Sequence, residues 1–205
     1  MGHPKLLLPW GETTVLGRTI GNALEVREAI DILRGEGPAD TTQVTYALGA
    51  EMLCLGGVAR DADEGRHKME EAVRSGAGLD KFRAIIEAQH GDPKVCDDPD
   101  RLPTASATTL VEAPSAGHIA GIDSFALGMA SMKLGAGRRR AEDNIDPAVG
   151  IELLRTVGDR VDEGEPIARL HHNSDPGNAA LEAQSAFELQ TDPVERLPLI
   201  IDRLE

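Results

Sequence analysis

The chain has 205 residues, and its 35 Asp and Glu against 21 Lys and Arg give it a formal net charge of −14. So acidic a chain is poorly suited to a phosphate backbone, and its basic cluster is confined to residues 138–140, which excludes nucleic acid as an expected partner. No apolar run approaches the roughly 18 residues that a membrane-spanning helix needs. We therefore expect no membrane partner and a cytoplasmic location.

The amino-acid composition argues against two further classes of protein, redox proteins and proteins that bind nucleic acids or sugars by aromatic stacking. Cys54 and Cys96 have neither the number nor the spacing of a zinc site or a disulfide framework, so redox chemistry is not indicated. Aromatic residues make up 2% of the chain, which leaves few platforms for stacking nucleic acids or sugars. The core is predicted to be aliphatic.

Residues 22–89 carry apolar side chains at helical spacing throughout. Asn22 followed by Glu25 is typical of a capped helix start, and Val26, Ile30 and Leu33 then form one apolar stripe. Three more helices are predicted, over residues 41–55, 63–75 and 78–89. All four are expected to present one apolar face.

Residues 90–103 contain three prolines and several acidic residues, which predicts a linker or a long surface loop. Beyond it the pattern changes from a helical period to short alternating segments. Strands are predicted over 108–112, 118–122 and 167–171, and helices over 124–134 and 178–189. Strands interrupted by helices in about 100 residues indicate an α+β domain.

Six sequence blocks occur in an order that resembles the pyrimidine-nucleoside phosphorylase family, which includes thymidine phosphorylase. They are GNALEVREAI (21–30), LGAEML (48–53), AQHGD (88–92), LGAGR (134–138), IDPAVGI (145–151) and GDRVDEGEP (158–166). The resemblance runs from about Leu16 to the C-terminus and corresponds to the second half of the family's chain.

The resemblance implies a division of the chain into three parts. Residues 1–21 would be an atypical N-terminal segment, and residues 22–103 the helical part of the phosphorylase α/β domain plus a linker. Residues 104–205 would be the family's C-terminal domain, a small α/β-hammerhead with a barrel-sandwich-like fold. Turns at 113–117 and 158–166 also resemble those of biotinyl and lipoyl carriers, but Lys133 precedes the second turn inside a predicted helix, so the resemblance to carriers concerns the fold and not lysine modification.

The same resemblance implies a pentosyltransferase reaction, the reversible phosphorolysis of thymidine or uridine to free base and (deoxy)ribose 1-phosphate. The family binds phosphate and the pyrimidine nucleoside with a Lys-His-Ser stretch and with Arg, Ser and Lys residues of its first half. No Lys-His-Ser occurs here, and we assign no catalytic or substrate-binding residue. The chain is expected to be inactive alone, as part of a phosphorylase that functions either as a homodimer or with a separate N-terminal half.

The resemblance implies that one binding site of the family, for potassium, has ligands in this chain. A potassium ion that steadies the phosphate-binding region takes two main-chain carbonyls and a carboxylate, which the resemblance carries over to Leu16, Thr19 and Glu28. Hard cations prefer such oxygen ligands. The alternative is that Glu28 is a solvated helix residue beside Arg27.

Two other readings stay open. The chain could be a non-catalytic subunit of a split phosphorylase that binds its partner through the Val26, Ile30 and Leu33 stripe. Residues 1–16 resemble a motif of molybdenum cofactor cytidylyltransferases, in which the lysine at the position of Lys5 contacts nucleotide phosphates. This chain lacks the accompanying Gly-rich loop, so a nucleotidyltransferase remnant is the weaker reading.

Two remaining motifs favour structural roles. The glycines and arginines of 135–140 could bind phosphate, but a helix C-cap followed by basic residues explains them as well. His171 and His172 would point to opposite faces of a strand, so they are predicted to be surface residues at the end of a strand and not a metal pair.

Overall fold

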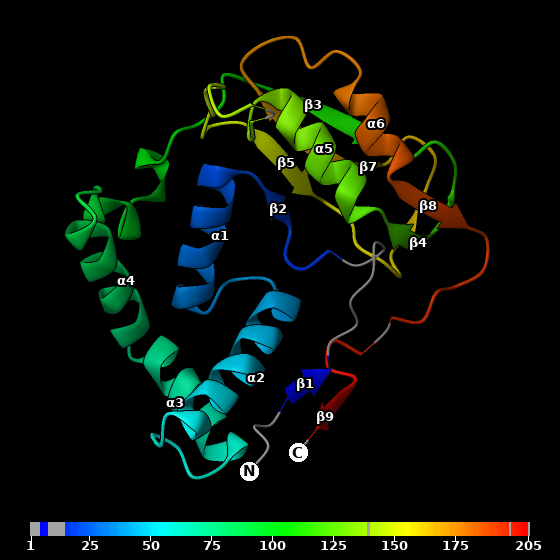
Figure 1. Ribbon diagram of the computed structural model, residues 1–205. Coiled ribbons are helices and arrows are strands. Elements are labelled where there is room, and N and C mark those ends of the chain that lie inside the picture. Colours follow the sequence, from blue (N-terminus) through cyan, green and yellow to red (C-terminus); the bar gives the residue numbers. More distant parts are fainter. Residues whose placement is uncertain (1–4, 8–14, 139, 197, 205) are drawn as a thin grey trace. The chain divides into compact units, whose positions relative to one another are not determined.

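The computed structural model describes residues 5–7, 15–138, 140–196 and 198–204, and these form two compact units (Figure 1). The helical unit contains the described residues up to 7, residues 28–101 and those from 198 onward. The mixed unit contains residues 15–27 and 102–196. Helix α1 (Asn22–Arg34) passes from one unit to the other between residues 27 and 28.

The helical unit continues with α2 (Ala39–Leu55), α3 (Ala62–Arg74) and α4 (Ala77–Ala88). Helices α2 and α3 cross closely because Gly65 leaves no side chain between them: a Cβ there would lie 2.8 Å from the Cα of Ala50. Asp61 caps α3 by accepting a hydrogen bond of 2.8 Å from the amide of Glu64. The short strands β1 (Lys5–Leu7) and β9 (Asp202–Leu204) pair antiparallel in the same unit.

The four predicted helices are confirmed to within three residues at each end. The expected apolar face of α4 is covered only in part. Its residues Leu79, Phe82 and Ile86 are half-buried and none of the α4 residues, all of which are described, is fully buried, whereas Ile30 of α1 is fully buried. Along α2, the side chains of Leu48, Met52 and Leu55 are exposed.

The predicted linker is an ordered part of the helical unit. Two 3-10 turns, η1 (Pro93–Cys96) and η2 (Pro99–Arg101), occupy it, and Val95 and Cys96 are buried. The guanidinium of Arg34 donates to the carbonyl of Cys96 at 2.8 Å. Prolines and acidic residues predicted a linker or a long surface loop, but here they begin turns and pair with arginines, which hold the segment against the helices.

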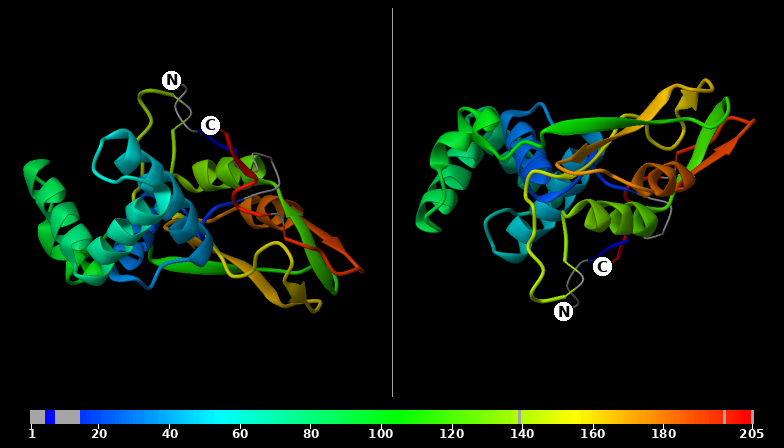
Figure 2. Two further views of the ribbon diagram at one scale, coloured as in Figure 1. Left: turned by 90° about the horizontal axis from the view of Figure 1, so that it is seen from below. Right: turned by 90° about the horizontal axis from the view of Figure 1, so that it is seen from above.

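Two antiparallel sheets build the mixed unit. The first has the order β2-β5-β7-β3 and the second the order β6-β4-β8. Their strands are β2 (Thr19–Ile20), β3 (Ala107–Glu112), β4 (Gly117–Ile122), β5 (Gly150–Leu153), β6 (Arg160–Val161), β7 (Pro166–His172) and β8 (Phe187–Gln190). Helices α5 (Ser124–Leu134) and α6 (Ala179–Ser185) lie side by side on one face of the four-stranded sheet (Figure 2). The predicted α+β class is confirmed.

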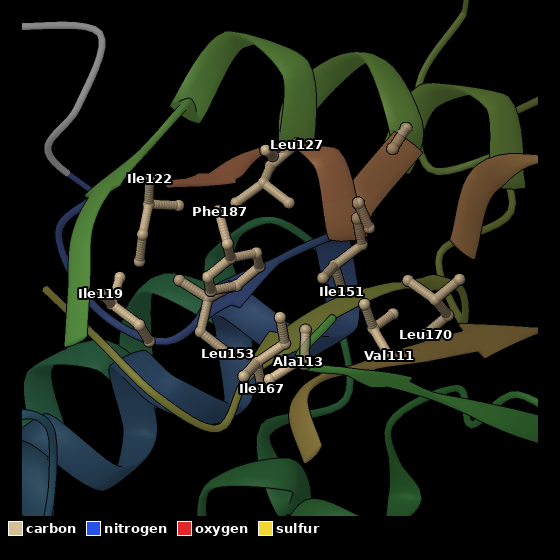
Figure 3. Packing of buried hydrophobic residues seen from close by; sticks show 14 of the residues in the cluster. Val111, Ala113, Ile119, Ile122, Leu127, Ile151, Leu153, Ile167, Leu170 and Phe187 are labelled. Atoms are coloured by element: carbon tan, nitrogen blue, oxygen red, sulfur yellow. The ribbon is translucent and has the colours of Figure 1, made fainter. Parts of the chain in front are cut away.

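The core of the mixed unit lies between the sheets and the two helices (Figure 3). It is aliphatic apart from Phe187, and it draws Ile122 from β4, Leu127 from α5 and Ile151 from β5. Each such fully buried side chain contributes about 1.5–3 kcal/mol. The core therefore needs few aromatic residues, because it is built from branched aliphatic residues.

The predicted helix over 178–189 is wrong in its last part. Helix α6 ends at Ser185, and Phe187 begins β8, which pairs with β4 so that Phe187 lies opposite Ile122. The tertiary pairing decides the structure here, since Phe187 enters the core as a residue of the strand that pairs with β4.

Candidate functional site

The segment that precedes α1 is fixed at several points by the mixed unit. The amide of Leu153 donates to the carbonyl of Arg18 at 2.6 Å, and the hydroxyl of Ser131 donates to the carbonyl of Ile20 at 3.2 Å. Gly17 is buried with φ of 77°, a left-handed conformation that glycine adopts without strain. This short stretch therefore has a defined path into α1.

The junction of β2 with α1 depends on two glycines. A Cβ at Gly21 would lie 2.6 Å from the carbonyl oxygen of Val149, and a Cβ at Gly150 would lie 2.3 Å from that of Ile20. The helix start itself is close to the prediction. The carboxylate of Glu25 accepts a hydrogen bond of 3.2 Å from the amide of Gly21, while Asn22 is exposed as the first helical residue.

The three residues predicted to bind potassium fall into both units. Leu16 is exposed ahead of β2, and Thr19 lies in β2; both belong to the mixed unit. Glu28 is half-buried in the second turn of α1 and belongs to the helical unit. Their donor set, two carbonyls and one carboxylate, consists of the hard oxygens that a potassium ion requires.

Sequence reasoning missed a charged row on the sheet face opposite α5 and α6. Glu152 of β5 lies directly across from Thr19 on one side and from Arg169 on the other. The guanidinium of Arg169 donates to its carboxylate at 2.6 Å, and Nε2 of His171 lies 3.5 Å from the same oxygen. The hydrogen bond with His171 foremost, and the charge and hydrogen bond of Arg169, hold the pKa of the half-buried Glu152 carboxyl below its ordinary value.

A local signal for this pair existed. Glu152 stands between Ile151 and Leu153, and Arg169 between Ala168 and Leu170, so each is a charged residue in an otherwise apolar strand. Opposite charges in that setting are typical of cross-strand pairs. The register that joins them is set by the fold, since 17 residues separate them in the sequence.

His172 is not a surface residue, contrary to the prediction. Its side chain is buried, with Nδ1 at 2.7 Å from the carbonyl oxygen of Ser174 and Nε2 at 2.9 Å from the hydroxyl of Thr109. The prediction that His171 and His172 lie on opposite faces is confirmed, since His171 contacts Glu152 instead. Alternation separates the two faces, but it cannot tell which face is covered by helices.

The predicted helix C-cap at Gly135 is confirmed. Gly135 ends α5 in the left-handed conformation with φ of 109°, and its amide and that of Ala136 bond to the last turn of the helix. Lys133, in the last turn of α5, pairs with Glu182 of α6 at 2.5 Å. Arg139 lies outside the described residues.

Other predictions have mixed outcomes. Cys54 is a half-buried free thiol and Cys96 a buried one. Within the described parts of the chain, no three His, Cys, Asp or Glu side chains gather as a metal site, and no helix there has the length and apolarity to cross a membrane. Of the cytidylyltransferase-like segment, residues 1–4 and 8–14 lie outside the described residues, and residues 5–7 form β1.

The stripe that would bind a separate partner is not exposed. Ile30 is fully buried within this chain, and Val26 and Leu33 are half-buried. These side chains are therefore largely used in the chain's own packing.

The mixed unit matches a known domain class. Residues 118–190, from β4 through β8, fit the sequence profile of the pyrimidine nucleoside phosphorylase C-terminal domain. The match includes α5, the turn around Gly158, and the strand that carries Arg169 and His171.

Relatives extend the match beyond that domain. The pyrimidine-nucleoside phosphorylases of Staphylococcus aureus strains USA300, COL and bovine RF122 / ET3-1 are each 47% identical to this chain over 158 residues. The aligned region covers 77% of this chain but 36% of each relative. Over this region the chain is homologous to pyrimidine-nucleoside phosphorylases.

Proposed function

We propose that this chain forms the C-terminal region of a pyrimidine-nucleoside (thymidine) phosphorylase. The reaction is the reversible phosphorolysis of thymidine or uridine to free base and (deoxy)ribose 1-phosphate, as part of nucleoside salvage in the cytoplasm. The observation that carries this proposal is the 47% identity over 158 residues to pyrimidine-nucleoside phosphorylases. Phosphate and the pyrimidine nucleoside are the substrates of the assembled enzyme.

In this proposal the chain holds the cation-binding segment and does not supply the reacting groups. The 205 residues contain no Lys-His-Ser stretch. The carbonyls of Leu16 and Thr19 and the carboxylate of Glu28 are the ligands proposed for potassium. A bound potassium ion would supply positive charge close to the phosphate subsite, and the chain's own residues hold its oxygen ligands in place.

The test is complementation. The purified chain is assayed for thymine and uracil release from thymidine and uridine, alone and mixed with the part of the Staphylococcus aureus phosphorylase that it does not match. We expect release only from the mixture, and only with phosphate present. Phosphate-dependent release by the chain alone would overturn the assignment of a non-reacting role, and a mixture that stays inactive while forming a complex would overturn the family activity.

Glu28→Gln tests the potassium assignment in the same assay. The variant keeps the size of the side chain but loses the anionic oxygen, so the mixture should need more potassium for half-maximal rate. Glu87→Gln, an exposed position of α4, is the matched control and should leave that concentration unchanged. Equal potassium dependence in both variants would remove Glu28 from the ligand set.

A further inference from the structure

Strand β2 lies at one edge of the four-stranded sheet, and its pairing with β5 determines where its main-chain groups point. The register of β2 with β5, extended by one residue, places Arg18 opposite Leu153, and the Leu153 amide donates to the Arg18 carbonyl, which makes this a hydrogen-bonded pair. Hydrogen-bonded and non-hydrogen-bonded pairs alternate along an antiparallel ladder. Thr19 opposite Glu152 is therefore a non-hydrogen-bonded pair, and the Thr19 carbonyl is directed away from β5.

A non-hydrogen-bonded pair brings its two side chains close together. The Cβ atoms of Thr19 and Glu152 are expected to lie about 4.5–5.5 Å apart on the face of the sheet opposite α5 and α6. A shift of the Glu152 side chain would therefore move Thr19, the edge residue that is proposed to bind potassium through its carbonyl.

Glu152 is itself held from the other side. Arg169 lies directly opposite it on the central strand β7 and donates to its carboxylate at 2.6 Å, while His171 approaches the same oxygen at 3.5 Å. Strand β7 is paired on both sides, with β5 and β3, so these two side chains are anchored in the interior of the sheet. The row from Arg169 through Glu152 to Thr19 links a fixed strand to an edge strand of two residues.

We infer that Glu152, braced by Arg169 and His171, is a positioning residue that sets the orientation of the Thr19 carbonyl for potassium. The inference rests on the proposed function, because the ion belongs to that proposal. Glu152 acts through the backbone of β2 and does not bind the ion. Residues that orient a metal ligand without binding the metal commonly change the metal affinity by 10–100-fold when they are replaced.

The test uses the full chain and potassium alone. Thermal unfolding is followed as potassium chloride replaces tetramethylammonium chloride at constant ionic strength, which gives the potassium concentration at half-maximal stabilisation. Glu152→Gln, which loses the charge but keeps the shape, should raise that concentration about tenfold. Arg169→Lys, which keeps the charge but not the planar donor pair, should raise it by less. Glu188→Gln, exposed on β8 of the other sheet, should leave it unchanged.

If Glu152 has only a structural role, the result differs. Glu152→Gln would then lower the melting temperature without potassium and leave the half-maximal potassium concentration unchanged, and that result would overturn the inference. Absence of any potassium-specific stabilisation in the unmodified chain would overturn both the potassium ligands and their positioning. It would leave the phosphorolysis proposal to the complementation assay, so the two failures can be told apart.

Discussion

Gly21 and Gly150 pass each other at the point where β2 leads into α1, and neither position has room for a side chain. A Cβ on Gly150 would lie 2.3 Å from the carbonyl oxygen of Ile20 and 3.0 Å from the Cα of Gly21. Both neighbours are main-chain atoms, so they cannot rotate away as a side chain could. The close approach holds the edge strand against β5 and fixes the first turn of the helix.

Gly150→Ala should therefore lower the free energy of unfolding by about 3 kcal/mol, because the added methyl group must displace the backbone. Gly164→Ala is the control. Gly164 has φ of 78° but no atom within 4 Å of the added carbon, so it should show only the conformational cost of about 1 kcal/mol. Chemical denaturation of both variants measures the difference, and equal losses would show that the close approach adds nothing.

The elements that the sequence predicts well carry their signals locally. Asp61 and Gly35 mark helix ends through caps and turns that need no tertiary context. Strand β2 has no such signal. It is two residues long, and its partner β5 lies far along the chain, so only the folded sheet defines it.

The candidate site shows the same limit. The resemblance to a family pointed to Thr19 and Glu28, but the bracing of β2 by Glu152 and Arg169 depends on strand register, which local patterns leave open. His172 was assigned to the surface for a related reason. Its neighbours alternate correctly, but the helices that cover one face of the sheet, α5 and α6, come from other parts of the chain (Figure 2).

The turn before β7 predicts a pH effect on stability. The carboxylate of Glu165 accepts hydrogen bonds from the amide of Asp162 at 2.9 Å and from the guanidinium of Arg155, and these contacts hold the Glu165 pKa below its ordinary value. Because the folded pKa is depressed, the stabilisation is complete above the unfolded value of about 4.3 and is lost as the pH falls through the folded pKa.

Glu165→Gln should accordingly melt at a lower temperature than the unmodified chain at pH 7, and the gap should narrow as the pH falls below about 4. Melting curves from pH 7 to pH 3 test this. Glu163→Gln, an exposed neighbour in the same turn, should show no comparable gap at pH 7. A gap for Glu165→Gln that persists at pH 3 would assign its effect to shape instead of charge.

The contacts of Arg34 predict how accessible the Cys96 thiol is to reagents. Its guanidinium donates to the carbonyls of Cys96 at 2.8 Å and Asp97 at 3.1 Å, which ties η1 to the end of α1. Cys96 is fully buried, and burial raises the pKa of its thiol. Arg34→Ala should lower the free energy of local opening by about 1.4 kcal/mol and so raise the labelling rate of Cys96 about tenfold.

Labelling with a disulfide reagent, resolved by peptide mass, compares Cys96 with the half-buried Cys54 in one sample. The rate at Cys54 should stay the same in Arg34→Ala. Arg74→Ala removes an exposed guanidinium that pairs within its own helix with Glu71, and it should leave Cys96 protected. A tenfold rise in that control as well would assign the effect to general loosening of the helical unit.

Thr109 should be worth more to stability than its neighbour Thr108, although both stand in β3. Because the Ser174 carbonyl can only accept, Nδ1 of the buried His172 donates to it, and Nε2 pairs with the Thr109 hydroxyl at 2.9 Å. Thr109→Val leaves that nitrogen buried without its hydrogen-bond partner and should cost about 1–3 kcal/mol in denaturant unfolding. Thr108 is exposed on the opposite face, so Thr108→Val should stay within about 0.5 kcal/mol. Equal costs would show that the His172 contact does not stabilise the fold.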